Sequence, residues 1–157
     1  MPAEDPRAGK HLVFRLATED FAIRVASVQE ILGIMEITSV PQTVPSVKGV
    51  INLRGRVIPV IDLRLRLGFP AQAYSKQTCI VVIRTRFGDS DRFTGVIVDE
   101  VSEVVNIVAG DIQDTPDFGI STPSPYLLGM ARTNDKVRIL LDIEQVLRSH
   151  GPITGQP

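Results

Sequence analysis

The sequence is poor in the residue types on which metal sites and most catalytic sites depend. Its 157 residues include two histidines, one cysteine and no tryptophan. Neither His11 nor His150 has a cysteine or another histidine three or four residues away, so the spacing of a zinc site is missing. No serine or cysteine stands in a nucleophile elbow, and no glycine-rich phosphate loop follows a predicted strand. We therefore expect no metal, no cofactor and no catalytic centre.

A strong net charge and long apolar runs are also missing. The formal net charge is -1 at pH 7, whereas general affinity for nucleic acid requires a strongly basic face. The apolar runs are far shorter than the roughly 18 to 20 residues that span a bilayer. Cys79 lies inside the apolar run TCIVVI, which indicates a small core residue rather than a nucleophile. We expect a soluble protein that stays in the compartment where it is made.

What the sequence does contain is a succession of short runs rich in β-branched residues, separated by turn signals. Such runs predict strands and hairpins over residues 11–25, 49–61, 79–87, 93–107, 127–133 and 136–141. Val28, Ile31 and Leu32 have helical spacing, which predicts one or two helical turns over residues 26–33. A closing helix is expected after Asp142.

Two internal similarities indicate a tandem repeat. Residues 49–67 align with residues 129–147 at an offset of 80 (129 − 49), and residues 23–31 align with 96–104 at an offset of 73 (96 − 23). The first alignment places Asp62 over Asp142, at a strand-to-helix junction in both cases. Each unit is too small to bury both faces of its sheet. We therefore expect small β-barrels, which remove exposed sheet edges by closing on themselves.

Arginines are concentrated in the stretch Lys48–Leu67, which reads KGVINLRGRVIPVIDLRLRL. Gly55 is the natural residue for its hairpin turn, because glycine accepts a positive φ without steric cost. Asp62 is predicted to cap the helical residues that follow it. We expect Arg64 and Arg66 to face water beside their leucine neighbours.

Arg54 differs from these arginines because it directly precedes Gly55, where a strand enters its turn. A guanidinium at that place either folds back onto backbone carbonyls or reaches outward to a partner, and both alternatives stay open. Glu30, in the run SVQEIL, is the acidic counterpart and is expected to be exposed on the short predicted helix. The sequence leaves two alternatives for the role of this residue, an ion pair and a docking contact.

Four segments together resemble the CheW family, the coupling adaptors of bacterial chemosensory systems, and the related regulatory domain of the histidine kinase CheA. They are FAIRVASVQEIL, VKGVINLRGRVIPVIDLRLRLG, TGVIVDEVSEVVNI and YLLGMARTNDKVRILLDIEQVL. The resemblance implies an all-β fold with short helices, in which two SH3-like five-stranded β-barrels form one domain over residues 11–150. Polar residues with Pro and Gly predict flexible ends at 1–10 and 151–157.

The same resemblance implies a non-catalytic adaptor that couples chemoreceptors to CheA. In that family the helical tip of a chemoreceptor docks between the two barrels, and barrel ends pair with the CheA regulatory domain. The family positions for these contacts fall on Val28, Glu30, Gly49 and Arg54. The implied location is the cytoplasm, with recruitment to membrane-associated receptor arrays and without direct insertion into the membrane.

Two other classes of function compete with this expectation. One is a small β-barrel that binds nucleic acid through its arginine-rich hairpin, but aromatic residues are only 5% of the sequence and leave few stacking platforms. The other is an enzyme fragment that uses Asp62 or Asp142 as an acid or base. The place of both residues before helical segments favours capping over catalysis.

Overall fold

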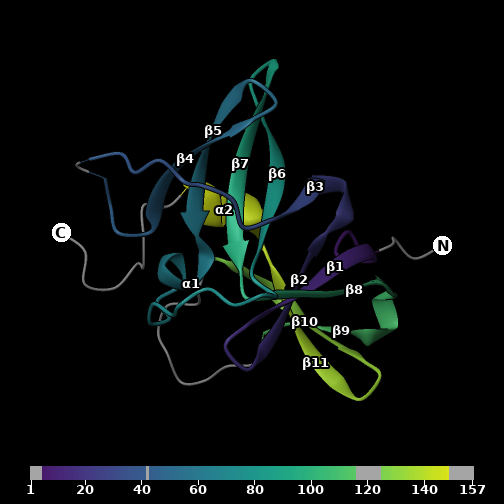
Figure 1. Ribbon diagram of the computed structural model, residues 1–157. Coiled ribbons are helices and arrows are strands. Elements are labelled where there is room, and N and C mark those ends of the chain that lie inside the picture. The colour runs from purple at the N-terminus through teal and green to yellow at the C-terminus, as the bar shows by residue number, and fades with distance from the viewer. Residues whose placement is uncertain (1–4, 42, 116–124, 149–157) are drawn as a thin grey trace.

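Strands form most of the protein, and they are arranged in two sheets, one in the upper half of Figure 1 and one at the lower right. The computed structural model describes residues 5–41, 43–115 and 125–148. We call the sheet at the lower right of Figure 1 barrel 1. Within the described residues it contains β1 (Gly9–Leu16), β2 (Glu19–Arg24), β8 (Glu100–Ile107), β9 (Ile112–Gln113), β10 (Leu127–Thr133) and β11 (Lys136–Leu141). Its strands lie in the order β8-β1-β2-β11-β10-β9. Barrel 2, in the order β3-β6-β7-β5-β4, contains β3 (Val28–Gly33), β4 (Val47–Leu53), β5 (Arg56–Asp62), β6 (Cys79–Phe87) and β7 (Ser90–Val98). The helical segments are α1 (Leu63–Arg66), α2 (Ile143–Arg148) and the 3-10 turns η1 (Val25–Ser27) and η2 (Ala109–Asp111).

Each sheet curls into a barrel, and segments outside the strands close the gap between its two outer strands. In barrel 1 the outer strands β8 and β9 are consecutive in the chain and are joined by residues 108–111. In barrel 2 Thr38, which follows the outer strand β3, forms an antiparallel bridge with Val50 on the opposite outer strand, β4. Closure covers sheet edges that otherwise pair with other chains. The prediction of two small barrels is confirmed, with five strands in barrel 2 and, within the described residues, six in barrel 1.

The two barrels do not coincide with the two sequence repeats. Barrel 1 takes the hairpin β1–β2 from the first repeat and β8 to β11 from the second. Barrel 2 takes β3, β4 and β5 from the first repeat and the hairpin β6–β7 from the second. The chain crosses between the barrels after β2 and crosses back after β7. The repeats are therefore equivalent in topology, but each barrel needs strands from both of them.

The largest cluster of buried apolar side chains lies between the barrels rather than inside either. Alternate residues of β6 show how it arises, because Ile80 and Val82 face the interior of barrel 2 whereas Val81 and Ile83 face the other barrel. We call this cluster the shared core; it contains Leu12, Phe14, Leu16, Phe21, Ile23, Ile61, Leu63, Val81, Ile83, Val96, Val98, Tyr126, Leu141, Ile143 and Val146. Since buried apolar surface stabilises by roughly 25 cal/mol per Å², this core is the main force that holds the barrels together.

Both helices begin at the aspartates that were predicted to cap them. The Asp62 carboxylate accepts a hydrogen bond from the backbone N–H of Arg64 at 3.0 Å. The Asp142 carboxylate accepts one from the backbone N–H of Gln145 at 3.3 Å. Each carboxylate thereby satisfies a donor that the first helical turn leaves unpaired. The predicted N-caps are confirmed.

The helix predicted over residues 26–33 is wrong. The structure has the short turn η1 followed by strand β3, whose residues alternate between half-buried and exposed. The apolar residues satisfied a helical spacing, but the antiparallel pairing of β3 with β6 decides the conformation. Glu30 consequently lies half-buried on an outer strand rather than exposed on a helix.

The prediction that Arg64 and Arg66 face water is also wrong. They are only 7% and 3% exposed. The helix α1 is one turn long, and Leu63 at its start enters the shared core, so the arginines that follow are carried below the surface. Their hydrogen-bond acceptors come from other segments of the chain, and the local sequence contains no signal for them.

Several smaller expectations can be placed on the structure. Cys79 is half-buried against the shared core, and Gly55 has φ +86 in the β4–β5 turn, as predicted. Strand β1 begins at Gly9, before the domain start expected at residue 11. The predicted tail 151–157 and His150 lie outside the described residues. No helix in the part of the chain that the structure describes is long and apolar enough to cross a membrane.

Substitution of Asp62 separates its capping role from its charge. Burial raises the pKa of the Asp62 carboxyl above its ordinary value, and this desolvation outweighs the backbone donors and the nearby cations. We expect Asp62→Ala to lower the free energy of unfolding by about 1 kcal/mol through loss of the cap. Asp62→Asn keeps an acceptor and removes a buried charge, so urea denaturation at pH 7 should give nearly wild-type stability. A loss as large as that of the alanine variant would contradict this prediction.

His11 makes folding sensitive to mild acid. The residue is 2% exposed, and its Nδ1 lies 2.9 Å from the carbonyl oxygen of Gly9. Burial lowers the pKa of the imidazole; the Gly9 carbonyl opposes this effect and the charge of Arg24 adds to it. The folded protein therefore binds the proton less readily than the unfolded chain. The stability is fully present above the ordinary pKa of about 6.5 and falls as the pH drops below it.

We accordingly expect the free energy of unfolding to decrease between pH 7 and pH 5, with a slope from this group of at most about 1.4 kcal/mol per pH unit. In His11→Gln this part of the slope should be absent. Urea denaturation of both proteins at four or five pH values measures the difference. Equal slopes in the two proteins would show that the buried imidazole is not the responsible group.

Candidate docking surface

The structure joins two of the predicted site residues, Glu30 and Arg54, in an ion pair. Glu30 lies on the outer strand β3. Arg54 lies in the β4–β5 turn, which directly follows the opposite outer strand, β4. Because the barrel closes, Arg54 Nη2 donates to Glu30 Oε1 across its rim. The Arg54 side chain is 70% exposed and the Glu30 side chain is 26% exposed. The pair is therefore accessible to water and to a binding partner.

Arg54 owes its position to a two-residue turn with a left-handed backbone. Its φ is +51, and Gly55 follows with its N–H donating to Asn52 Oδ1 at 2.9 Å. A positive φ costs a non-glycine residue roughly 1 to 2 kcal/mol. The equivalent turn of barrel 1 uses Asn134 and Asp135, whose side chains tolerate this backbone better. An arginine that the turn disfavours indicates a use for its side chain.

The mouth of barrel 2 forms a hollow of about 340 Å³ beside the ion pair. Apolar and charged side chains line it together: Gln29, Glu30, Leu53, Arg54, Arg56, Ile58, Val82 and Phe93. The Arg56 guanidinium lies 4.7 Å from the centre of the Phe93 ring, in a cation–π contact. A hollow of this kind suits docking, because apolar burial supplies affinity and the charges set the orientation.

Barrel 1 holds the equivalent acid in a different setting. Glu103 corresponds to Glu30 in the repeat, but its partner is Arg138 on β11, with Nη2 3.3 Å from Oε2. Arg138 is 2% exposed, and its other nitrogens lie 3.2 Å from Asp20 Oδ2 and 2.9 Å from Thr133 Oγ1. Breaking a buried pair leaves an uncompensated charge, whereas an exposed pair contributes little to stability. The buried Arg138 and its pair with Asp20 therefore belong to the fold, whereas the Arg54 guanidinium of barrel 2 lies at the surface, where a partner can reach it.

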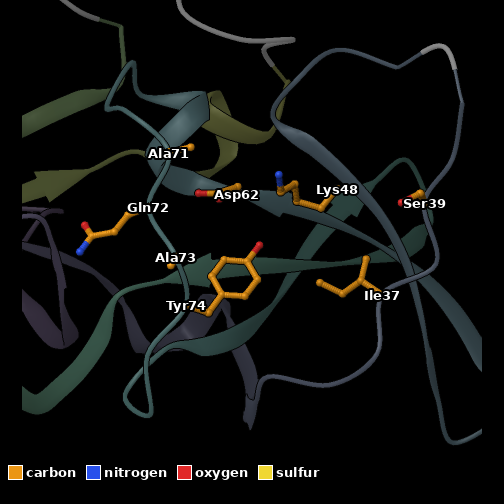
Figure 2. A pocket seen from close by; sticks show the side chains of 8 residues that line it. All are labelled: Ile37, Ser39, Lys48, Asp62, Ala71, Gln72, Ala73 and Tyr74. Carbon is orange, nitrogen blue, oxygen red and sulfur yellow. The ribbon is translucent and has the colours of Figure 1, made fainter.

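A second hollow, of about 420 Å³, lies beside α1 (Figure 2). Its lining residues are Ile37, Ser39, Lys48, Asp62, Ala71, Gln72, Ala73 and Tyr74. The hydroxyl of Tyr74 points toward the space between Asp62 and Lys48 (Figure 2), and burial together with the Asp62 charge raises the pKa of that hydroxyl. Asp62 is 3% exposed and is engaged as the cap of α1, while Asp142 caps α2. Capping thus explains both aspartates without acid or base chemistry.

The other two predicted site residues have positions that serve the barrel. Val28 begins β3 and packs against the shared core. Gly49 lies on β4 at an irregularity of the β4–β5 pairing, beside the bridge that closes barrel 2. Neither residue lines the hollow that holds Glu30 and Arg54. Among the described residues, no group of three His, Cys, Asp or Glu side chains is placed to hold a metal ion.

Phe93 and Arg56 are part of this surface, although neither was predicted as a site residue. Arg56 was noted only as one of the arginines of the stretch Lys48–Leu67. The two residues are separated by 37 positions (93 − 56) and meet through the arrangement of β5 and β7. The residues next to Phe93 in the sequence do not indicate which side chains its ring contacts.

The fold and the hollow define this chain as a two-barrel β-protein whose exposed site suits docking. Comparisons with known proteins extend this description. The sequence matches the family described as the CheW-like domain over residues 10–151. The chemotaxis protein CheW of Bacillus subtilis is 38% identical over 157 residues, which are 100% of this chain and 98% of that protein. CheW of Klebsiella aerogenes is 36% identical over 138 residues, which are 88% of this chain and 81% of that protein.

A solved structure has the same fold. It is the scaffolding protein TtCheW from Thermoanaerobacter tengcongensis, which superimposes with a TM-score of 0.78 at 32% sequence identity. The match covers 92% of this chain and 95% of that one. The chain belongs to the CheW family, as its sequence motifs predicted.

Gly49 gives a test of barrel closure. Its φ is +142, and a Cβ built there would lie 1.9 Å from the Thr38 carbonyl oxygen, which accepts a hydrogen bond from Val50. The equivalent Gly129 of barrel 1 has φ +148 and would place its Cβ 2.6 Å from the Gln113 carbonyl oxygen. Both barrels therefore need a glycine where a neighbouring segment comes closest, Thr38 against β4 in barrel 2 and β9 against β10 in barrel 1.

We expect Gly49→Ala to lower the free energy of unfolding by about 2 to 4 kcal/mol, the sum of backbone strain and overpacking. Thermal and urea denaturation measure this loss. Gly33→Ala is the matched control, because a Cβ at Gly33 meets nothing within 4 Å and its φ is not positive. A loss at Gly49 no larger than that at Gly33 would contradict the role in closure.

Proposed function

We propose that this chain is a non-catalytic adaptor that couples chemoreceptors to the histidine kinase CheA. Membership of the CheW family supports the proposal, as do relatives named as chemotaxis or scaffolding proteins. The adaptor binds the tip of a chemoreceptor and the regulatory domain of CheA, and it needs no cofactor. It acts in the cytoplasm and joins membrane-associated receptor arrays through these two partners.

The observation that carries the proposal is the exposed ion pair of Glu30 and Arg54 beside an apolar hollow. An exposed pair contributes at most about 1 kcal/mol to stability, so one member can change partners at small cost to the fold. Arginine presents several donors in a plane and is frequent at the centres of interfaces. A partner that places an apolar side chain in the hollow and a polar group on the rim meets both requirements of this surface.

Coupling by such an adaptor is a matter of geometry. A receptor that changes state alters the position of the segment bound to the adaptor, and the adaptor passes this change to the kinase as a difference in binding free energy.

The surface of barrel 2 does not favour the alternative of nucleic-acid binding. The Phe93 ring is covered by the Arg56 guanidinium, and Arg54 is already paired with Glu30, so stacking and phosphate contacts would require both to rearrange.

Substitution of Arg54 tests the proposal. We expect Arg54→Ala to weaken binding of a receptor cytoplasmic fragment, of CheA, or of both by about tenfold or more, which corresponds to about 1.4 kcal/mol. The free energy of unfolding should change by less than about 0.5 kcal/mol, because the lost pair is exposed. Titration calorimetry and urea denaturation measure the two quantities. Asn134→Ala, at the equivalent turn of barrel 1, is the matched control and should bind both partners like the wild type.

Three results would count against this account. If the wild-type chain binds neither the receptor fragment nor CheA, the proposed function is wrong. If Arg54→Ala binds both partners normally, the docking role of Arg54 is wrong while the adaptor function stands. If Arg54→Ala no longer folds, Arg54 is a structural clamp of the barrel, and the docking surface must lie elsewhere.

A further inference from the structure

Helix α1 carries two arginines that are almost fully withdrawn from water and that do not line the docking hollow. Arg64 and Arg66 follow β5 of barrel 2, next to the shared core. Burying a guanidinium costs several kcal/mol unless well-placed acceptors surround it. The acceptors of these two side chains therefore indicate what the arginines do.

Arg64 connects α1 to the point at which the chain crosses from barrel 2 to barrel 1. Its Nη1 donates to Asp99 Oδ2 at 2.8 Å, and its Nε donates to the Pro70 carbonyl oxygen at 3.1 Å. Asp99 stands between β7 of barrel 2 and β8 of barrel 1. The same Oδ2 accepts the backbone N–H of Ala17 at 2.7 Å, and the Asp99 N–H donates to the Arg15 carbonyl oxygen at 3.1 Å. One carboxylate thus joins α1 to the β1–β2 hairpin of barrel 1.

Arg66 connects the helices that end the two repeats. Its Nε donates to Ser46 Oγ at 2.8 Å, directly before β4 of barrel 2. Its Nη1 donates to the Val146 carbonyl oxygen at 2.8 Å, in helix α2, which follows β11 of barrel 1. Val146 is also the residue that the repeat places at the position of Arg66, at the offset of 80 (146 − 66). The two equivalent helices are therefore hydrogen-bonded to each other beside the shared core.

The shared core holds the barrels together, but apolar burial is non-directional and does not by itself determine their angle. Hydrogen bonds from a guanidinium are directional and are strong when the acceptor is charged. We propose that Arg64 and Arg66 are positioning residues that fix the orientation of barrel 1 relative to barrel 2. The consequence for signalling rests on the proposed function, because partners bound to different barrels are then held at an angle that these arginines set.

A distance measurement between the barrels tests this inference without any partner. Val57 on β5 and Val137 on β11 are equivalent in the repeat and are 66% and 56% exposed. Nitroxide labels on Val57→Cys and Val137→Cys, in a Cys79→Ala background, report the distance between barrel 2 and barrel 1 by pulsed electron spin resonance. We expect a single narrow distribution of distances in this parent protein.

Removal of the donors should loosen the arrangement. Arg66→Met keeps an unbranched apolar stem and deletes the guanidinium, and we expect it to broaden the distribution about twofold or to add a second distance. Arg64→Met should act in the same direction, and Arg66→Lys, which keeps donors, should stay near the parent. Arg84→Met removes an exposed arginine of β6 and is the matched control, with no expected change.

Stability alone does not decide the question, because replacing a buried charge by an apolar side chain is often neutral or even stabilising. A variant that unfolds cooperatively and keeps the parent distribution of distances overturns the inference. If Arg66→Met does not fold, Arg64→Met carries the same test under the same criterion.

A second measurement connects the inference to coupling. With a receptor fragment and CheA, Arg66→Met should bind each partner separately within about twofold of the parent, yet lose about fivefold or more of the stimulation of kinase activity. Unchanged stimulation, together with a broadened distance distribution, would show that the angle does not matter for coupling. If the parent binds neither partner, the proposed function fails, and the distance measurement still decides the role of the two arginines.

Discussion

The shared core between the barrels is the constraint on which the rest of this structure depends. A strand of a small closed barrel has one face inside, and the face outside must be covered by something other than water if it is apolar. Here β6 places Ile80 and Val82 in its own barrel and Val81 and Ile83 against the other one. Neither barrel is complete without the second, and the exchange of strands between the repeats makes the two halves of the chain interdependent.

Directional interactions then determine details that apolar packing leaves open. Gly49 and Gly129 allow Thr38 and strand β9 to approach β4 and β10 where any side chain would collide with a carbonyl oxygen. Asp62 and Asp142 begin the two helices by capping them. The arginines of α1 add hydrogen bonds to Asp99, between β7 and β8, and to helix α2, which follows β11 of barrel 1. Each of these contacts acts where the chain turns or crosses, rather than within a strand.

The two barrels show how one scaffold separates stability from binding. Glu103 in barrel 1 is paired with Arg138, which is buried and reaches Asp20 as well. Glu30 in barrel 2 is paired with Arg54, which stands on a strained turn and is mostly exposed. The two acids occupy equivalent positions of the repeat, but their arginine partners do not: one is buried on β11 of barrel 1 and the other lies on the rim of barrel 2. The buried Arg138 guanidinium is costly to leave without its partners, whereas the exposed Arg54 guanidinium is available to a partner.

Much of the fold was readable from residues that act locally. The alternation of apolar residues predicted the strands, Gly55 predicted its turn, and Asp62 and Asp142 predicted the helix starts, because each of these signals depends on a few neighbouring positions. The repeat predicted two barrels as well. It could not show that the barrels exchange strands, because strand pairing depends on contacts between segments far apart in the chain.

The predictions that were wrong have the same cause, namely contacts between segments far apart in the chain. Residues 26–33 satisfied a helical spacing, but pairing with β6 made most of them a strand. Arg64 and Arg66 were predicted to face water, but both are buried. Their hydrogen-bond acceptors Asp99 and Ser46 are distant in the sequence. Neighbouring residues and motifs were enough to establish the local elements, the equivalence of the two repeats and the family. Only the folded structure brings Glu30 to Arg54 and Arg64 to Asp99. These contacts join side chains that are far apart in the sequence, so no local pattern of residues predicts them.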